Sequence, residues 1–303
     1  MNQSQRGHTV YMPAADGPRH RLFAMSLMVG SSVAMSFGGL IVRNMEDADP
    51  WQINFYRSIA LMIAVTIILL FQYRRLAITY VKGIGQSGVV GDVMLGMAGI
   101  TFLQSLTHTT VANTLFTLSA IPFITAGLAR VLLKERLNPS TVIAMMAAAI
   151  GISIMLSEGL GAGSIYGNAM ALTTACCFAS FAVIVRRNRQ TDMLPTVLVS
   201  GLVVMIISGS LRIGDLGIPL HDLLLCFLWG GLLAGIANWT FIIAARHLAA
   251  AEVTLIMLLE FALGPIWVWL FLSEEPSGWT LFGGTVVIAS VAIRALVELR
   301  LSR

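Results

Sequence analysis

Two stretches of the sequence match at a constant spacing of 139 residues: GDVMLGMAGITFLQSLTHTTVAN over 91–113 and GGLLAGIANWTFIIAARHLAAAE over 230–252. The register continues without a gap to residues 141 and 280, and its identities include Gly96/Gly235, Thr101/Thr240 and His108/His247. A gapless register of this length predicts that the chain is built from an internal repeat.

The composition places this repeat in a membrane. Hydrophobic residues make up 57% of the 303 residues and charged residues 11%, whereas soluble domains average about 25% charged residues. With only 3 cysteines, a disulfide-rich secreted scaffold is excluded as well. Ten apolar runs are each long enough to cross about 30 Å of hydrocarbon: 22–42, 53–71, 87–106, 110–133, 141–156, 165–185, 194–211, 223–245, 250–272 and 279–295.

The basic residues indicate the orientation. If the N-terminus is cytosolic, sixteen of the 19 basic residues fall on the cytosolic side, and only Arg43 and Arg212 fall outside, with Arg57 inside a span. Each repeat holds five spans, an odd number, so the second must enter the membrane from the opposite side. We therefore predict an all-α membrane protein with two inverted five-helix repeats and cytoplasmic termini. Its expected parts are a tail over 1–21 and repeats over 22–158 and 159–303.

Inverted repeats are typical of alternating-access transporters, whose substrate sites lie near the membrane midplane. The sequence shows no ATP-binding loop, no HExxH motif and no Ser/His/Asp grouping at matching depth, so we expect neither an enzyme nor a bound cofactor or metal. The basic pI of 9.3 reflects membrane topology rather than nucleic-acid binding. Lipid head-group flippases and, less directly, channels are the competing classes.

The repeats resemble the drug/metabolite transporter superfamily, in its ten-span bacterial branch of paired EamA-type repeats. The motifs that carry the likeness are TVAN over 110–113, AIP over 120–122, LLKERL over 132–137, AAAE over 249–252, LLE over 258–260 and FLSEEP over 271–276. The resemblance implies a carrier in the inner membrane that exports small metabolites such as amino acids, often with protons. It also implies a cavity lined by spans 1, 3, 4, 6, 8 and 9.

One departure from the family pattern concerns proline. Span 4 has Pro122 where it is expected, but span 9 reads Glu260-Phe261 instead of Glu-Pro, and Pro265 follows one turn later. Since proline kinks a helix, these positions predict that the two spans bend at different heights.

Glu260 lies about ten residues into span 9, near the midplane. A carboxylate at this depth is expensive and usually faces a cavity or a partner. We expect Glu260 to contribute to the substrate or proton pathway. The alternative is a glutamate that joins span 9 to a neighbouring helix by hydrogen bonds.

Two further ionisable residues are candidates for the proton pathway or for a structural charge. Arg57 lies about five residues into span 2; it either binds a substrate carboxylate or extends to the surface to pair with Asp49 or Glu46. His108, in the connection after span 3, either relays protons or caps the end of its helix.

Five other residues are predicted to contact substrate, because they lie on spans expected to line the cavity: Gln104, Thr114, Thr117, Asn238 and Trp239. Asn238 and Trp239 together offer an amide and a ring to a small organic ligand. The threonines have an alternative role in hydrogen bonds between helices, and Trp239 has one in packing or lipid contact.

Overall fold

The computed structural model describes residues 18–74, 85–157, 164–272 and 277–301. Within these ranges the chain is helical, and ten helices are long and apolar enough to cross a membrane, which confirms the predicted fold class. The tail up to residue 17, the boundary between the repeats at 158/159, and Glu274 of the FLSEEP motif lie outside the described residues. The inverted relation of the halves and the orientation of the termini stay predictions.

Several spans consist of more than one helical segment. The first five spans are α1 (Pro18–Met35) with α2 (Gly38–Arg43), α3 (Pro50–Tyr73), α5 (Gln86–His108), α6 (Val111–Leu118) with α7 (Ile121–Leu132), and α8 (Pro139–Leu156). The second five are α9 (Ile165–Arg187), η2 (Leu194–Thr196) with α10 (Val197–Leu211), α11 (Leu220–Phe227) with the π-helical segment η3 (Leu228–Leu233) and α12 (Ala234–His247), α13 (Ala250–Met257) with α14 (Leu259–Leu272), and α15 (Gly278–Leu301).

Short polar residues start several of these helices, because the first backbone N–H groups of a helix have no partner within it. The carboxylate of Asp49 accepts hydrogen bonds from the N–H groups of Trp51 and Gln52 at the start of α3, and the Gln52 side chain accepts one from the Asp49 N–H. The hydroxyl of Ser164 accepts one from the N–H of Gly167 at the start of α9. These caps fix where spans begin in a sequence that is otherwise uniformly apolar.

Spans 4 and 9 are each interrupted near the middle, at matching positions. The first break falls at Ser119, between α6 and α7, and the second at Leu258, between α13 and α14. Since these two residues are related by the same spacing of 139, the prediction that the spans bend at different heights is wrong.

Proline accounts for only one of the breaks. Pro122 follows the break at Ser119, but Pro265 lies inside α14, beyond the break at Leu258. At Leu258 the backbone tightens locally: its N–H bonds to the carbonyl of Leu255, and the Phe261 N–H bonds to the carbonyl of Leu258. This three-residue spacing of hydrogen bonds is that of a 3₁₀ turn, which is narrower than an α-helix.

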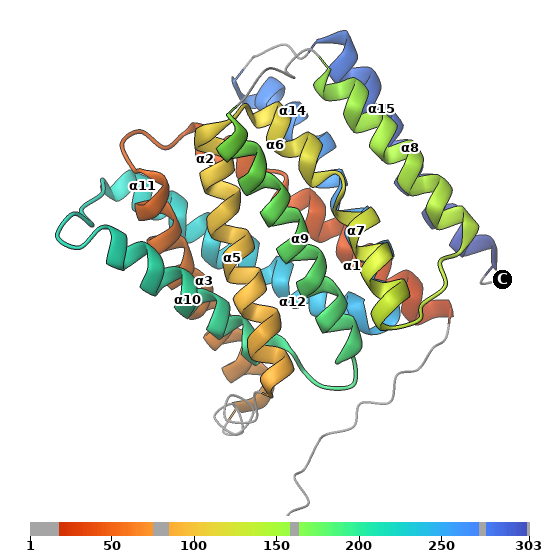
Figure 1. Ribbon diagram of the computed structural model, residues 1–303, viewed down its shortest axis with the longest axis horizontal. Coiled ribbons are helices and arrows are strands. Elements are labelled where there is room, and N and C mark those ends of the chain that lie inside the picture. Colours follow the sequence, from red (N-terminus) through yellow and green to blue (C-terminus); the bar gives the residue numbers. More distant parts are fainter. Residues whose placement is uncertain (1–17, 75–84, 158–163, 273–276, 302–303) are drawn as a thin grey trace, which may run out of the picture.

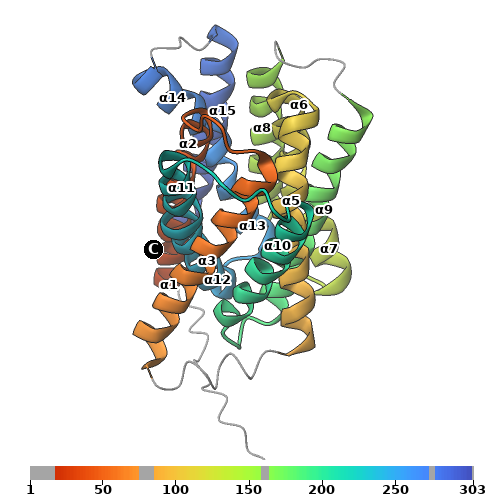
Figure 2. The ribbon, with the colours of Figure 1, turned by 90° about the vertical axis from the view of Figure 1, so that its left-hand side faces the viewer.

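The spans form two layers. Figure 2 shows α5, α8, α9 and α10 on one side of the molecule and α1, α2, α11 and α15 on the other. Within the layers, α5 packs on α9 and α12 packs on α1; between them, α8 packs on α15 and α3 on α10 (Figure 1). Under the 139-residue register the α5–α9 pair corresponds to the α12–α1 pair. The α8–α15 pair and the α3–α10 pair each correspond to themselves, because each joins two helices that are counterparts of one another. This packing supports the predicted repeat.

Small residues let the helix backbones approach closely. A Cβ added at Gly283 of α15 would lie 2.3 Å from the carbonyl oxygen of Gly151 in α8. The interface between α8 and α15 therefore consists of backbone against backbone at this point.

We expect Gly283→Ala to lower the thermal stability of the protein, because overpacking a tight contact costs about 1–3 kcal/mol. The matched control is Gly278→Ala at the start of α15, where a Cβ meets nothing within 4 Å. Size-exclusion chromatography after heating in detergent measures how much of each variant remains folded. Equal stability of the two variants would contradict the close contact.

Candidate functional site

A cavity of about 230 Å³ lies in the middle of the bundle, between the two layers. Its walls come from eight of the ten spans, and the breaks in spans 4 and 9 both open onto it. Spans 2 and 7 contribute to the lining in addition to the six that the family resemblance implied; Arg57 and Ser200 are examples. The described residues of spans 5 and 10 stay at the edge of the bundle and line none of it.

The core of the cavity follows the repeat. Lining residues that correspond at a spacing of 139 are Leu95/Ala234, Ala98/Ala237, Phe102/Phe241, Leu118/Met257, Met35/Thr174, Leu61/Ser200, Gly99/Asn238 and Ile121/Glu260. In the last four pairs the second half supplies the polar member. The two halves thus give the cavity a similar shape but different chemistry.

The two ends of the cavity are not equivalent. Asn54, Arg57 and Ser58 line it on span 2, whereas their counterparts on span 7, Met193, Thr196 and Val197, do not. The cavity therefore extends toward the membrane face where α3 begins. It is closed toward the face where α1 begins, which we call the terminal face.

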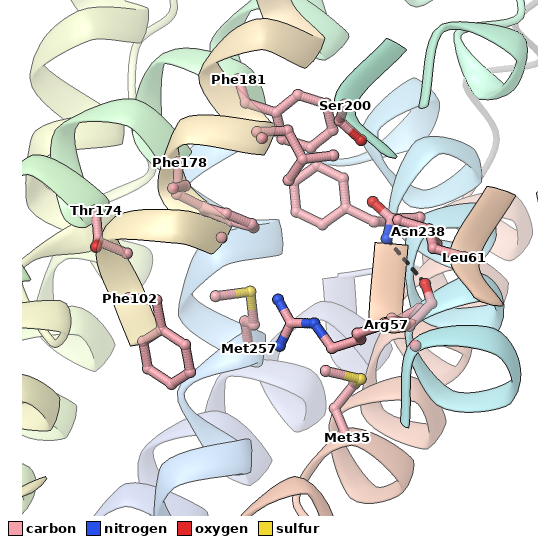
Figure 3. A pocket seen from close by; sticks show the side chains of 18 of the residues that line it. Met35, Arg57, Leu61, Phe102, Thr174, Phe178, Phe181, Ser200, Asn238 and Met257 are labelled. Carbon is pink, nitrogen blue, oxygen red and sulfur yellow. Dashed lines mark hydrogen bonds between the residues drawn. The ribbon is translucent and has the colours of Figure 1, made fainter. Parts of the chain in front are cut away.

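Arg57 points into the cavity, with its guanidinium between Met35, Met257 and Phe102 (Figure 3). Its Cζ lies 4.3 Å from the centre of the Trp229 ring, a cation–π contact. A Cβ at Gly230 would lie 2.2 Å from the carbonyl oxygen of Arg57. Two neighbouring residues of the π-helical segment η3 thus position Arg57. The Trp229 ring contacts its guanidinium, and Gly230, which has no side chain, leaves room for its backbone.

Asn54 lies one turn before Arg57 on α3 and is fully buried. It lines the cavity, yet neither its amide nitrogen nor its amide oxygen has a hydrogen-bond partner among the described residues. An unpaired buried polar group costs about 1–3 kcal/mol, so this amide is suited to a polar ligand in the cavity.

Glu260 lies in the first turn of α14, directly after the break at Leu258, and lines the cavity. It and Arg57 act on each other electrostatically, without forming an ion pair. The cavity thus brings together a cation, an anion and an unpaired amide on otherwise apolar walls.

The other predicted substrate residues divide between the cavity and the surrounding bundle. Asn238 lines the cavity, although its amide N–H₂ also donates to the carbonyl of Ala234 (Figure 3). Gln104 is buried outside the cavity lining, and Trp239 is partly exposed on α12.

Two threonines and His108 make local hydrogen bonds outside the cavity. The hydroxyl of Thr114 is 2.7 Å from that of Ser105, which joins α6 to α5, and Thr117 donates to a carbonyl of its own helix. His108 Nδ1 lies 2.8 Å from the carbonyl oxygen of Gln104 at the end of α5. A substrate or proton role for these residues stays a prediction.

The alternative in which Arg57 pairs with Asp49 is wrong. The carboxylate of Asp49 caps α3 and forms an ion pair with Arg212. Sequence reasoning also missed Asn54, although an asparagine inside an apolar run was a usable signal, since polar side chains within a membrane are costly unless they have a partner.

Ion pairs close the terminal face, some within the second half and some between the halves. Glu252 at the start of α13 pairs with Arg21 of α1 at 3.0 Å and with Arg294 of α15. Glu135 pairs with Arg186 of α9 at 2.7 Å. Glu252 also accepts a hydrogen bond from the N–H of Ala249, the residue before α13, and so caps this helix.

Comparisons with known proteins show similarity to a family in the first half of the chain. Residues 22–157 match the model of the EamA-like transporter family. One crystal structure of a protein, 17% identical in sequence, matches with a TM-score of 0.74 over 92% of this chain and 99% of the other. At this identity the likeness shows the fold alone. No curated protein matches the chain.

We expect Gly230→Ala to displace Arg57, because the new Cβ would overlap the Arg57 backbone. Gly231→Ala is the matched control: its Cβ would meet Ala60 at an ordinary distance of 3.4 Å. In the first variant the affinity for ligand should fall, and the free energy of unfolding should fall by about 1–3 kcal/mol. In the second variant both should change little. If both variants behave alike, η3 does not position Arg57.

Proposed function

We propose that this chain, whose residues 22–157 match the EamA-like transporter family, is a membrane transporter that exports amino acids with apolar side chains. It does so across a bacterial-type inner membrane by alternating access around the central cavity. The observation that carries this proposal is the placement of Arg57, Glu260 and the unpaired Asn54 amide in one cavity.

These groups match the charged end of an amino acid. The guanidinium of Arg57 offers paired N–H donors to a carboxylate, and the amide of Asn54, one turn away, offers a further donor. The carboxylate of Glu260 offers an acceptor to an ammonium group. A zwitterion would neutralise both charges and give the Asn54 amide its missing partner.

The rest of the cavity suits an apolar side chain. Phe241 contacts Phe178 edge-on and stacks on Phe181, with ring centres 5.6 and 5.5 Å apart. All three rings line the cavity. Its volume of about 230 Å³ is below the roughly 300–1,000 Å³ typical of drug-sized ligands, which favours a solute of amino-acid size.

Alternating access requires that each end of the cavity opens in turn. In this structure the terminal face is closed by the Glu252 and Glu135 ion pairs, and the cavity extends toward the opposite face. With the predicted cytoplasmic termini, this is the state that releases solute outside. Breaking those ion pairs would then admit solute from the cytosol, with protons as the candidate coupling ion.

Counterflow in proteoliposomes tests the proposal. Proteoliposomes that contain the wild-type protein and are loaded with unlabelled L-leucine or L-phenylalanine should show saturable, trans-stimulated uptake of the labelled amino acid. Arg57→Gln and Glu260→Gln should each raise the half-saturation constant about tenfold or more, since a hydrogen bond to a charged group contributes about 1.5–3 kcal/mol. Glu46→Gln, at an exposed glutamate, is the control. Absence of exchange across a broad metabolite panel would favour a lipid head-group flippase.

Asn54→Leu should separate stability from binding. Removing an unpaired buried amide should raise the midpoint of thermal unfolding. The same change should raise the half-saturation constant for amino acids about tenfold, the equivalent of 1.4 kcal/mol. A less stable variant with unchanged affinity would show that Asn54 supports the fold and does not contact solute.

A further inference from the structure

A second carboxyl group lies inside the membrane-spanning region, outside the cavity. Asp92 is on α5, two turns from the end that starts at Gln86, and is fully buried. Neither carboxyl oxygen has a hydrogen-bond donor among the described residues. An ionised carboxylate without donors is strongly disfavoured in an apolar interior.

The polar group that faces Asp92 is the hydroxyl of Thr196 in η2. That hydroxyl donates its single proton to the carbonyl oxygen of Met193 at 2.6 Å. The oxygen of that hydroxyl keeps lone pairs that can accept a hydrogen bond from a protonated carboxyl.

The charged groups around this site are already engaged. On the elements packed against this part of α5, α9 presents Ile184 beside Gly91, and η2 presents Thr196. Nearby on the same face, Arg186 pairs with Glu135, and Asp192 pairs with Arg246 and Tyr73. Within the described part of the chain, no charged group acts on Asp92.

The internal repeat relates this site to the open end of the cavity. Thr196 is the counterpart of Arg57, and Gly91, next to Asp92, is the counterpart of Gly230, on which Arg57 rests. Arg57 and Gly230 line the cavity, whereas Thr196 and Asp92 lie just beyond its closed end. Leu95 and Gly96, one turn after Asp92, still line it. When inverted repeats exchange their conformations, the cavity end that was closed becomes the open one.

We propose that Asp92 is a proton-binding site that becomes accessible to water only when the cavity opens to the terminal face. In the present state the carboxyl holds its proton and donates it to the Thr196 hydroxyl oxygen. In the opposite state the carboxyl exchanges that proton with the water of the terminal face. The coupling of this proton to solute movement rests on the proposed function. The protonation of Asp92 in the present state does not depend on it.

Infrared difference spectroscopy tests the protonation state without any solute. The carbonyl stretch of a protonated carboxyl should be present in the wild-type protein in lipid at neutral pH and should be weaker in Asp92→Asn. The exposed Asp215 gives the control Asp215→Asn, which should keep the band. A band of unchanged intensity in Asp92→Asn would overturn the proposal.

Flux measurements in proteoliposomes test the coupling. An imposed pH gradient should drive accumulation of L-leucine by the wild-type protein and about tenfold less by Asp92→Asn, while counterflow stays within about twofold. Undiminished pH-driven accumulation in Asp92→Asn would overturn the coupling. If no amino acid is carried at all, the proposed function fails, and the infrared result still decides whether Asp92 holds a proton.

Discussion

The contact between the Arg57 guanidinium and the Trp229 ring determines much of the structure around the cavity. A cation inside a membrane needs a partner, and here the partner is an aromatic face rather than an anion. The ring reaches this position because span 8 widens into η3, and the arginine backbone fits because Gly230 has no side chain. The π-helical segment of the neighbouring helix thus provides the contact that stabilises a charge at this depth.

The internal repeat explains the shape of the cavity, and the differences between the halves explain its chemistry. At four corresponding pairs of lining positions the polar residue belongs to the second half. The first half contributes Arg57 and Asn54, whose counterparts Thr196 and Met193 lie beyond the closed end. A solute in the cavity therefore contacts polar groups from both halves at once. Relative movement of the halves would change both sets of contacts.

Much of the fold was predictable, because span length, charge position and the gapless register are properties of the sequence itself. Glu260, Arg57 and Asn238 were also predicted, since polar residues near the midplane are rare enough to be informative. Whether the side chains of Gln104, Thr117 and Trp239 point into the cavity was not predictable. Membrane helices are apolar on nearly all sides, so hydrophobic periodicity does not tell a cavity face from a lipid face. The break at Leu258 has no proline to mark it, and only its backbone hydrogen bonds reveal it.

The contact of Gly151 with Gly283 has a mechanical consequence. At this point α8 and α15 touch through their backbones, at the opposite edge of the bundle from the α3–α10 pair (Figure 1). Interlocking side chains oppose the turning of one helix against another, whereas a bare backbone crossing leaves that rotation free. Gly283 lies five residues after the start of α15, toward the face opposite the terminal face. Rotation about this contact would therefore change the separation of the two layers most at the terminal face.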